Sequence, residues 1–145
     1  MPGFTKGPSY RVPFGRNEFL RSTQDIKTES YTVDASKVTV EDIDGTDLKV
    51  LQTGMVMAKI TGSSKIGPYD VNATDGREIT ANIVGINDTF LPWQLNERDV
   101  EVAVVYEAAV VAAWCFEDVT GVRTALGGTT QTAIEGNAAL GLIFK

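Results

Sequence analysis

The sequence predicts a mainly β domain with one short helix near its C-terminus and an extended arm at its N-terminus. Short stretches rich in β-branched and aromatic residues alternate with Gly, Asp and Pro turn signals, which is typical of an all-β scaffold. The 145 residues are enough for one domain. The first 28 residues follow neither the helical nor the strand period. We therefore predict an arm over residues 1–30 and a β-rich domain over residues 31–145.

The predicted arm combines prolines, glycines and polar residues with isolated large side chains. We interpret it as a segment that a partner orders, in which the scattered aromatic residues serve as anchors. The alternative is a lead that packs back on its own domain. The candidate binding residues of the arm are its large and basic side chains: Phe4, Tyr10, Arg11, Phe14, Arg16, Phe19, Leu20 and Arg21.

The charge of the chain is unevenly distributed. Residues 1–28 contain five basic and two acidic residues and so carry +3, which leaves −9 for the remainder of a chain whose net charge is −6. A basic lead is compatible with a nucleic-acid arm, but these cations are well spaced and include no consecutive pair. An acidic protein surface accounts for the charge equally well, and we expect no direct nucleic-acid contact.

After the arm, turn signals divide the chain into short strand candidates. The turns are expected at Asp44-Gly45, Gly62-Ser63-Ser64, Gly67-Pro68 and Asp75-Gly76. The strand candidates between and beside them are residues 31–33, 38–40, 48–51, 55–61 and 79–86.

The clearest strand begins at Val100, because valines alternate with other residues as far as Glu107. The apolar run from Ala108 to Phe116 follows it and predicts a core segment or a subunit interface. This run contains the single cysteine, Cys115, which we expect to be buried. Near the end, residues 132–135 fit a capping box that opens a short helix closed by Gly141, and residues 142–144 fit a last strand.

Few residues indicate a catalytic or metal-binding site. Histidine, the commonest general base and metal ligand, is absent. The acidic stretch 42–47 lacks the spacing of a calcium loop and is interpreted as a turn. Asp70, Asp75 and Glu78 flank a glycine-containing loop, where we expect ordinary solvated carboxylates. We therefore expect no enzyme, no metal and no cofactor, and no apolar run approaches the length of a membrane helix.

One long segment resembles a known family. It contains Leu51-Gln-Thr-Gly-Met-Val-Met-Ala-Lys-Ile-Thr61, then Gly67-Pro-Tyr-Asp70, then Asp75-Gly-Arg-Glu78 and Gly85-Ile86. The order of these pieces resembles the lambda-type bacteriophage head decoration family. Residues 103–106, the apolar run to Trp114 and residues 137–143 are similar to the closing strands and last helix of that family, so the resemblance covers about two-thirds of the chain.

The resemblance implies a compact, β-tulip-like domain that forms a homotrimer without catalytic activity or cofactor. It implies that the trimer is made in the host cytoplasm and binds at three-fold and quasi-three-fold positions on the outer surface of the expanded virion head. The partner there is the major capsid protein. Residues 88–99, with Pro92 and Trp93, read as an insertion relative to the family. The alternatives are another β-rich virion component, such as a head fibre or tail adaptor contacting host or glycan, and, third, a hydrolase using Asp70, Asp75 and Glu78.

Overall fold

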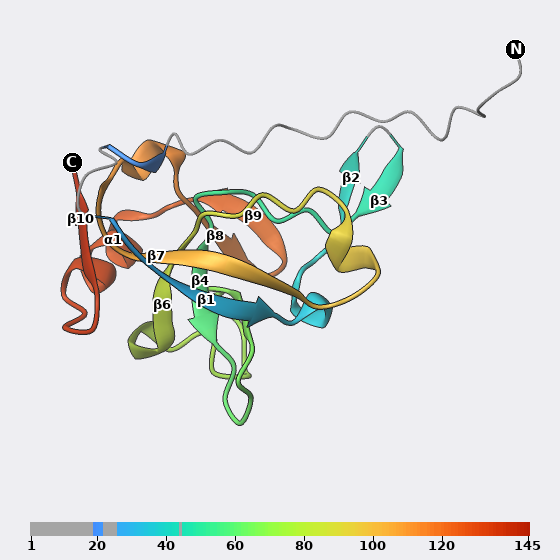
Figure 1. The fold of residues 1–145 in the computed structure, drawn as a ribbon, viewed down its shortest axis with the longest axis horizontal. Helices are drawn as coiled ribbons and strands as arrows, with labels where there is room; N and C mark the ends of the chain where they lie inside the picture. The colour runs from blue at the N-terminus through green and yellow to red at the C-terminus, as the bar shows by residue number, and fades with distance from the viewer. Residues whose placement is uncertain (1–18, 22–25, 44) are drawn as a thin grey trace, which may run out of the picture.

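The computed structural model describes residues 19–21, 26–43 and 45–145, and they form a mainly β domain with one α-helix, as predicted (Figure 1). The strands in this part of the chain are β1 (Lys27–Val33), β2 (Glu41–Ile43), β3 (Thr46–Leu48), β4 (Val56–Lys59), β5 (Ile66–Pro68), β6 (Ile83–Asn87), β7 (Val100–Val110), β8 (Phe116–Val119), β9 (Val122–Ala125) and β10 (Gly141–Phe144). The helices are α1 (Gly128–Glu135) and the short 3-10 turns η2 (Ala35–Lys37), η3 (Thr80–Asn82), η4 (Gln94–Asn96) and η5 (Ala112–Trp114).

Five strands close into a small barrel in the order β1–β5–β4–β6–β7, and β7 returns to pair with β1. β7 is the longest of them and its pairing with β1 is antiparallel from Val100 to Glu107. β10 adds to the far end of β7 as a parallel strand. Closure removes the free edges of β1 and β7 that an open sheet would expose.

The sheet has an apolar cluster on each face, as the alternation of side chains along a strand requires. All five barrel strands contribute to one cluster, with Val33, Ile66, Met57, Val84 and Val104 among its members, so this cluster is the barrel interior. The other cluster lies outside the barrel, where α1 and β10 contribute to it. Its members include Val56, Ile86, Val105, Ile134 and Leu142.

The predicted strand from Val100 to Glu107 is confirmed, and the structure extends it to Val110. The apolar run that follows does not continue as a strand, because the chain turns through η5 into β8. Two glycines allow the tight packing around these elements. A Cβ on Gly85, whose φ is +142°, would lie 2.2 Å from the carbonyl oxygen of Val105, and one on Gly54, at φ +92°, would lie 2.2 Å from that of Trp114.

Two hairpins form separate two-stranded sheets beside the barrel. β2 and β3 form the first, with Gly45 at its turn, so the stretch 42–47 forms a hairpin as the sequence indicated (Figure 1). The prediction of a strand at 38–40 is wrong, because β2 begins only at Glu41. β8 and β9 form the second hairpin, whose turn contains Thr120 at φ 51°.

The C-terminal helix is present but its predicted limits are wrong. α1 begins at Gly128 and ends at Glu135, and Gly136 caps it. Thr132 lies inside the helix, where its hydroxyl donates to the carbonyl of Gly128 at 3.0 Å instead of capping an N-terminus. The predicted last strand is confirmed as β10, which Gly141 opens.

The predicted arm boundary at residue 30 is also wrong. β1 begins at Lys27, and Phe19 is only 1% exposed within the outer cluster. The periodicity of the sequence did not predict that Phe19 is buried. The segment around it pairs with the barrel through a single β-bridge, between Leu20 and Val110, and is too short to show a strand period. The segment read as an insertion, 88–99, packs on the body through buried Leu91 and Leu95 and through the ion pair of Asp99 with Lys65.

Candidate functional site

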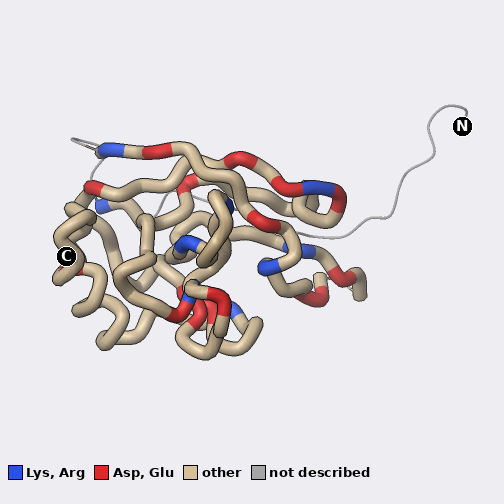
Figure 2. Tube along the Cα trace, turned by 90° about the horizontal axis from the view of Figure 1, so that it is seen from below, with Lys and Arg blue, Asp and Glu red and all other residues tan. Residues whose placement is uncertain are grey.

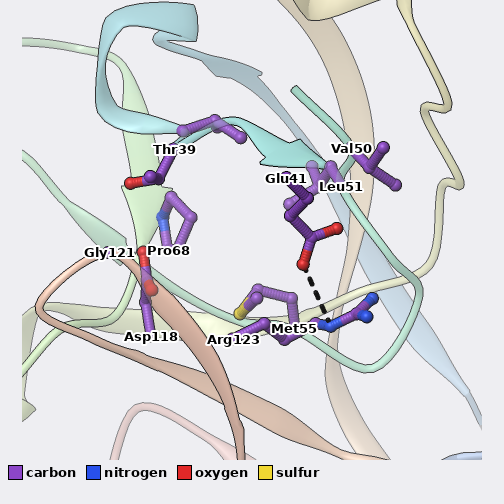
Figure 3. Close-up of a pocket in the computed structure, with 10 residues that line it drawn as sticks. Thr39, Glu41, Val50, Leu51, Met55, Pro68, Asp118, Gly121 and Arg123 are labelled. Carbon is purple, nitrogen blue, oxygen red and sulfur yellow. Dashed lines mark ion pairs between the residues drawn. The ribbon is translucent and has the colours of Figure 1, made fainter. Parts of the chain in front are cut away.

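A polar cleft lies where three loops meet. Its walls come from residues 36–39 around η2, from the loop 70–77 that follows β5, and from the turn of the β8–β9 hairpin at 118–121. The cleft encloses about 530 Å³. A smaller pocket beside it shares Thr39, Asp118 and Gly121 and holds about 20 Å³, which is room for about one water molecule (Figure 3).

Asp118 is the carboxylate common to both spaces. It is 5% exposed and lies beside Asp70, which is 6% exposed, because the two residues form a parallel β-bridge. One oxygen of Asp70 accepts hydrogen bonds from the backbone amides of Asn72 at 2.8 Å and Thr120 at 3.2 Å. Burial, followed by the charge of Asp70, raises the pKa of Asp118 to about 6. Asp70 thus connects two loops, while Asp118 is a buried carboxyl that ionises with difficulty.

Asp75 pairs with two basic residues, Lys37 and Arg77, that also line the cleft. Its carboxylate binds the Arg77 Nε at 3.0 Å and the Lys37 Nζ at 3.2 Å. Burial opposes ionisation of Asp75, but the hydrogen bonds from Arg77 and Lys37 outweigh it and lower the pKa of Asp75 below its usual value. The Arg77 guanidinium also donates to the carbonyl of Pro68 at 3.1 Å. This trio joins η2 to the end of β5.

An ion pair closes the smaller pocket. In Figure 3 the carboxylate of Glu41 on β2 points to the guanidinium of Arg123 on β9, and the two are 3.4 Å apart. The same guanidinium lies 5.3 Å from the centre of the Phe116 ring, within cation–π range. The second carboxylate oxygen of Glu41 is buried and has no hydrogen-bond partner within the described part of the chain. The pair links the β2–β3 hairpin to the β8–β9 hairpin.

The structure brings two of the three acids singled out from the sequence to the same cleft. Asp70 and Asp75 line the cleft, whereas Glu78 lies outside its lining and accepts from the amide of Gly76 at 2.8 Å. The expectation of solvated carboxylates is wrong for Asp70, which is buried. Sequence reasoning missed Asp118, because only the β-bridge between distant segments brings it to Asp70.

Asp70 accepts hydrogen bonds from backbone amides and Asp75 binds neighbouring cations, and these contacts hold the loops together. Within residues 19–21, 26–43 and 45–145, no group of three or more histidine, cysteine, aspartate or glutamate residues is placed to hold a metal ion. No helix in the same described part is long and apolar enough to span a membrane.

The predicted arm residues divide into two sets. Phe19, Leu20 and Arg21 are described, whereas the other five lie outside the described residues: Phe4, Tyr10, Arg11, Phe14 and Arg16. Phe19 is a core residue, which corrects its predicted role as an anchor for a partner, and Leu20 is half-buried against the same cluster. Arg21 is exposed. The alternative interpretation, a lead that packs on its own domain, therefore applies to this end of the predicted arm.

Backbone hydrogen bonds fix the described end of the arm to the barrel. The Val111 amide donates to the Phe19 carbonyl at 2.7 Å, and the Arg21 amide donates to the Ala109 carbonyl at 2.9 Å. The preceding residues 1–17 contain Lys6, Arg11 and Arg16 and no acid. On the body, by contrast, acidic residues outnumber basic ones and spread over strands and loops (Figure 2). No protein-family model and no curated protein matches this chain.

Proposed function

We propose that this chain is a bacteriophage capsid decoration protein. As a homotrimer it sits at three-fold and quasi-three-fold positions of the expanded head and clamps subunits of the major capsid protein against internal DNA pressure. The proposal draws on the resemblance of the sequence to the lambda-type decoration family. The observation that carries it in the folded chain is a basic, acid-free segment, 1–17, that leads into a residue locked in the core of a closed barrel.

The attachment of the arm suits a clamp. A load on the arm passes through Phe19, which is buried in the outer cluster, and through two backbone hydrogen bonds to the end of β7. β7 in turn pairs with β1, β6 and β10. Pulling the arm away therefore requires the core to open, and the load is shared by most of the sheet.

The arm can bind a capsid subunit through its backbone and its aromatic side chains together. An extended segment gains main-chain hydrogen bonds by adding to an exposed strand edge, while its aromatic residues Phe4, Tyr10 and Phe14 fill pockets. Ordering such a segment costs about 2–5 kcal/mol. Three arms on one trimer offset this cost, because the second and third engagements are intramolecular. A clamp specific for the expanded lattice stabilises that lattice by mass action.

The decisive experiment deletes residues 1–17 and retains Phe19. The truncated protein should melt like the full chain, because the deletion ends before the core residue, yet its affinity for expanded heads in co-sedimentation should fall at least about 100-fold. Full-strength binding by the truncated protein would place the capsid contact on the body. Binding of the full chain to tails or to host glycans, with none to heads, would favour the alternative virion component.

Two sets of substitutions separate the forces. Changing Lys6, Arg11 and Arg16 to Ala should weaken binding mainly at low salt, because exposed ion pairs are screened and are worth at most about 1 kcal/mol each. Changing Phe4 and Phe14 to Ala should weaken binding at every ionic strength, because a buried Phe contributes about 1.5–3 kcal/mol. We expect the aromatic set to have the larger effect.

A further inference from the structure

A hollow at the N-terminal end of α1 is lined by residues from several parts of the body. It encloses about 290 Å³, and its walls come from the end of β5, from η3, from β8 and from the first turn of α1. Val71 and Ala133 give it apolar surface, and Val71 is 53% exposed. Its hydroxyl-bearing residues are Tyr69, Thr80, Thr129 and Thr130. The hollow therefore combines hydroxyl groups with apolar surface.

The β-bridge of the polar cleft also supplies two side chains, Tyr69 and Glu117, to this hollow. Each of them directly precedes one of the bridged residues, Asp70 and Asp118. Because side chains alternate along an extended chain, Tyr69 and Glu117 point to the side away from the cleft. On that side Tyr69 packs in the outer cluster, and the Glu117 carboxylate accepts from the Gly127 amide at 2.8 Å, directly before α1.

Two buried hydroxyls of this hollow have no hydrogen-bond partner. Tyr69 is 3% exposed and Thr130 is 8% exposed, and neither side chain makes a hydrogen bond to any other described residue. Burial, followed by the charges of Glu117 and Asp70, raises the pKa of Tyr69, so the phenol keeps its proton and can donate. Buried polar groups in folded proteins are nearly always hydrogen-bonded. The two hydroxyls therefore indicate that the hollow takes an occupant that bonds to them.

The end of α1 adds donors, and Glu117 limits the charge of what binds there. The first amides of a helix have no acceptor within the helix, and no side chain caps them at Gly127. A Cβ on Gly128 would meet no atom within 4 Å, so the space beside these amides is open. The Glu117 carboxylate already lies at this end and would repel an anion, while the positive end of the helix dipole opposes a cation. A neutral ligand with several hydrogen-bonding groups meets both conditions.

We propose that this hollow binds a neutral sugar residue of a glycan. A sugar hydroxyl both donates and accepts, so it bonds to the Glu117 carboxylate while it accepts from Tyr69 or from an amide of α1. The C–H face of the ring packs on Val71 and Ala133. The volume is at the low end of the range of about 300–1,000 Å³ for ligand pockets, which suits one ring.

A neighbouring hollow leaves room for the rest of the glycan. It also encloses about 290 Å³, shares Thr80 and Ala133 with the first, and continues along α1 to residues 136–138. A sugar residue linked to the bound one has space there. The inference goes beyond capsid binding and does not depend on it, because residues of the body alone line both hollows.

An NMR titration of the full chain with neutral hexoses and N-acetylhexosamines tests the proposal. The backbone amide signals of residues 127–130 should shift as the sugar is added into the millimolar range. Glucuronic acid and inorganic phosphate, the anionic probes, should shift them less, because Glu117 repels them.

Two variants remove one hydroxyl each from the hollow. Tyr69→Phe and Thr130→Val should each raise the Kd of the sugar about threefold to tenfold, because each loses one hydrogen bond to it. Tyr31→Phe is the matched control, since the Tyr31 hydroxyl binds Glu29 on β1 outside the hollow, and its Kd should stay within about twofold of the parent value. Amide signals away from the hollow that match those of the parent chain establish that each variant is folded.

Three results would overturn the inference. If no neutral sugar shifts the signals of residues 127–130, the two hydroxyls bond to water only. If sugars bind equally well to the parent chain, Tyr69→Phe and Thr130→Val, they bind at another place. If phosphate or glucuronic acid binds more tightly than the neutral sugars, the end of α1 is an anion site. The proposed capsid function is tested separately by the deletion of residues 1–17, so either idea can fail while the other stands.

Discussion

Replacing Asp118 with Asn should make the protein more stable at neutral pH. Asp118 is buried at the junction of the two polar spaces, and above its pKa the folded chain must keep a charge there. The charged groups that affect its ionisation come from every neighbouring element: Asp70 and Glu41 raise the pKa and Arg77 lowers it. Asn has nearly the same shape and no charge, so it removes the cost of ionisation while filling the same space.

The expected size follows from the pKa. Burial and then Asp70 raise the pKa of Asp118 from its ordinary 3.8 to about 6. Since each pKa unit corresponds to about 1.4 kcal/mol, ionised Asp118 lowers the free energy of unfolding by about 3 kcal/mol relative to an exposed aspartate. The folded chain binds the proton more tightly than the unfolded chain, so the contribution of Asp118 falls as pH rises from about 4 to about 6 and is constant above.

Denaturant titrations at pH 7.5 and pH 4.5 measure this effect. The free energy of unfolding of Asp118→Asn should exceed that of the parent chain by up to about 3 kcal/mol at pH 7.5, and the difference should shrink at pH 4.5. Glu101→Gln on the exposed face of β7 is the matched control and should change stability by less than about 0.5 kcal/mol at either pH. A pH-independent difference between Asp118→Asn and the parent would refute the assignment of a costly buried charge.

Two further predictions test the core. Burial raises the pKa of the Cys115 thiol to about 12, so native protein should react with a thiol reagent far more slowly than unfolded protein, and equal labelling rates would contradict its burial. Phe19→Ala should lower the free energy of unfolding by about 3–5 kcal/mol, measured by denaturant titration, because it empties a fully buried site; a loss below about 1 kcal/mol would mean that Phe19 is not a core residue.

The local patterns in the sequence predicted the strands well where a period was long enough to read. The valine alternation from Val100 located β7, and the turn signal at Asp44-Gly45 located the β2–β3 hairpin, whereas the β8–β9 hairpin, with its turn at Thr120 and Gly121, was not predicted. The two predicted features depend on residues that are close in the sequence, so they can be predicted without knowing the tertiary structure. The helix limits failed for the opposite reason. Thr132 to Glu135 has the residue types of a capping box, but side-chain hydroxyls in mid-helix satisfy the same pattern by bonding a carbonyl four residues back.

The features that depend on distant pairing could not be predicted. Asp70 and Asp118 are 48 positions apart, and only their β-bridge puts one buried carboxyl beside another. Phe19 lies among prolines, glycines and polar residues, so its segment looks like arm, yet a bridge to Val110 places it in the core. In both cases one or two backbone contacts decide the environment of a side chain, and such contacts leave no period in the sequence.

The end of β7 gives the last argument for a partner of the arm. Segment 19–21 runs antiparallel to β7 and reaches its end at Phe19, because after Val111 the chain turns into η5. The other edge of β7 is occupied by β6 and β10, and barrel closure occupies the edge toward β1. Near Val110 both edges of β7 are therefore paired, so an upstream segment that adds to a strand must do so at another edge, either that of β10, which ends the sheet order, or one on another protein, as the proposed capsid clamp requires.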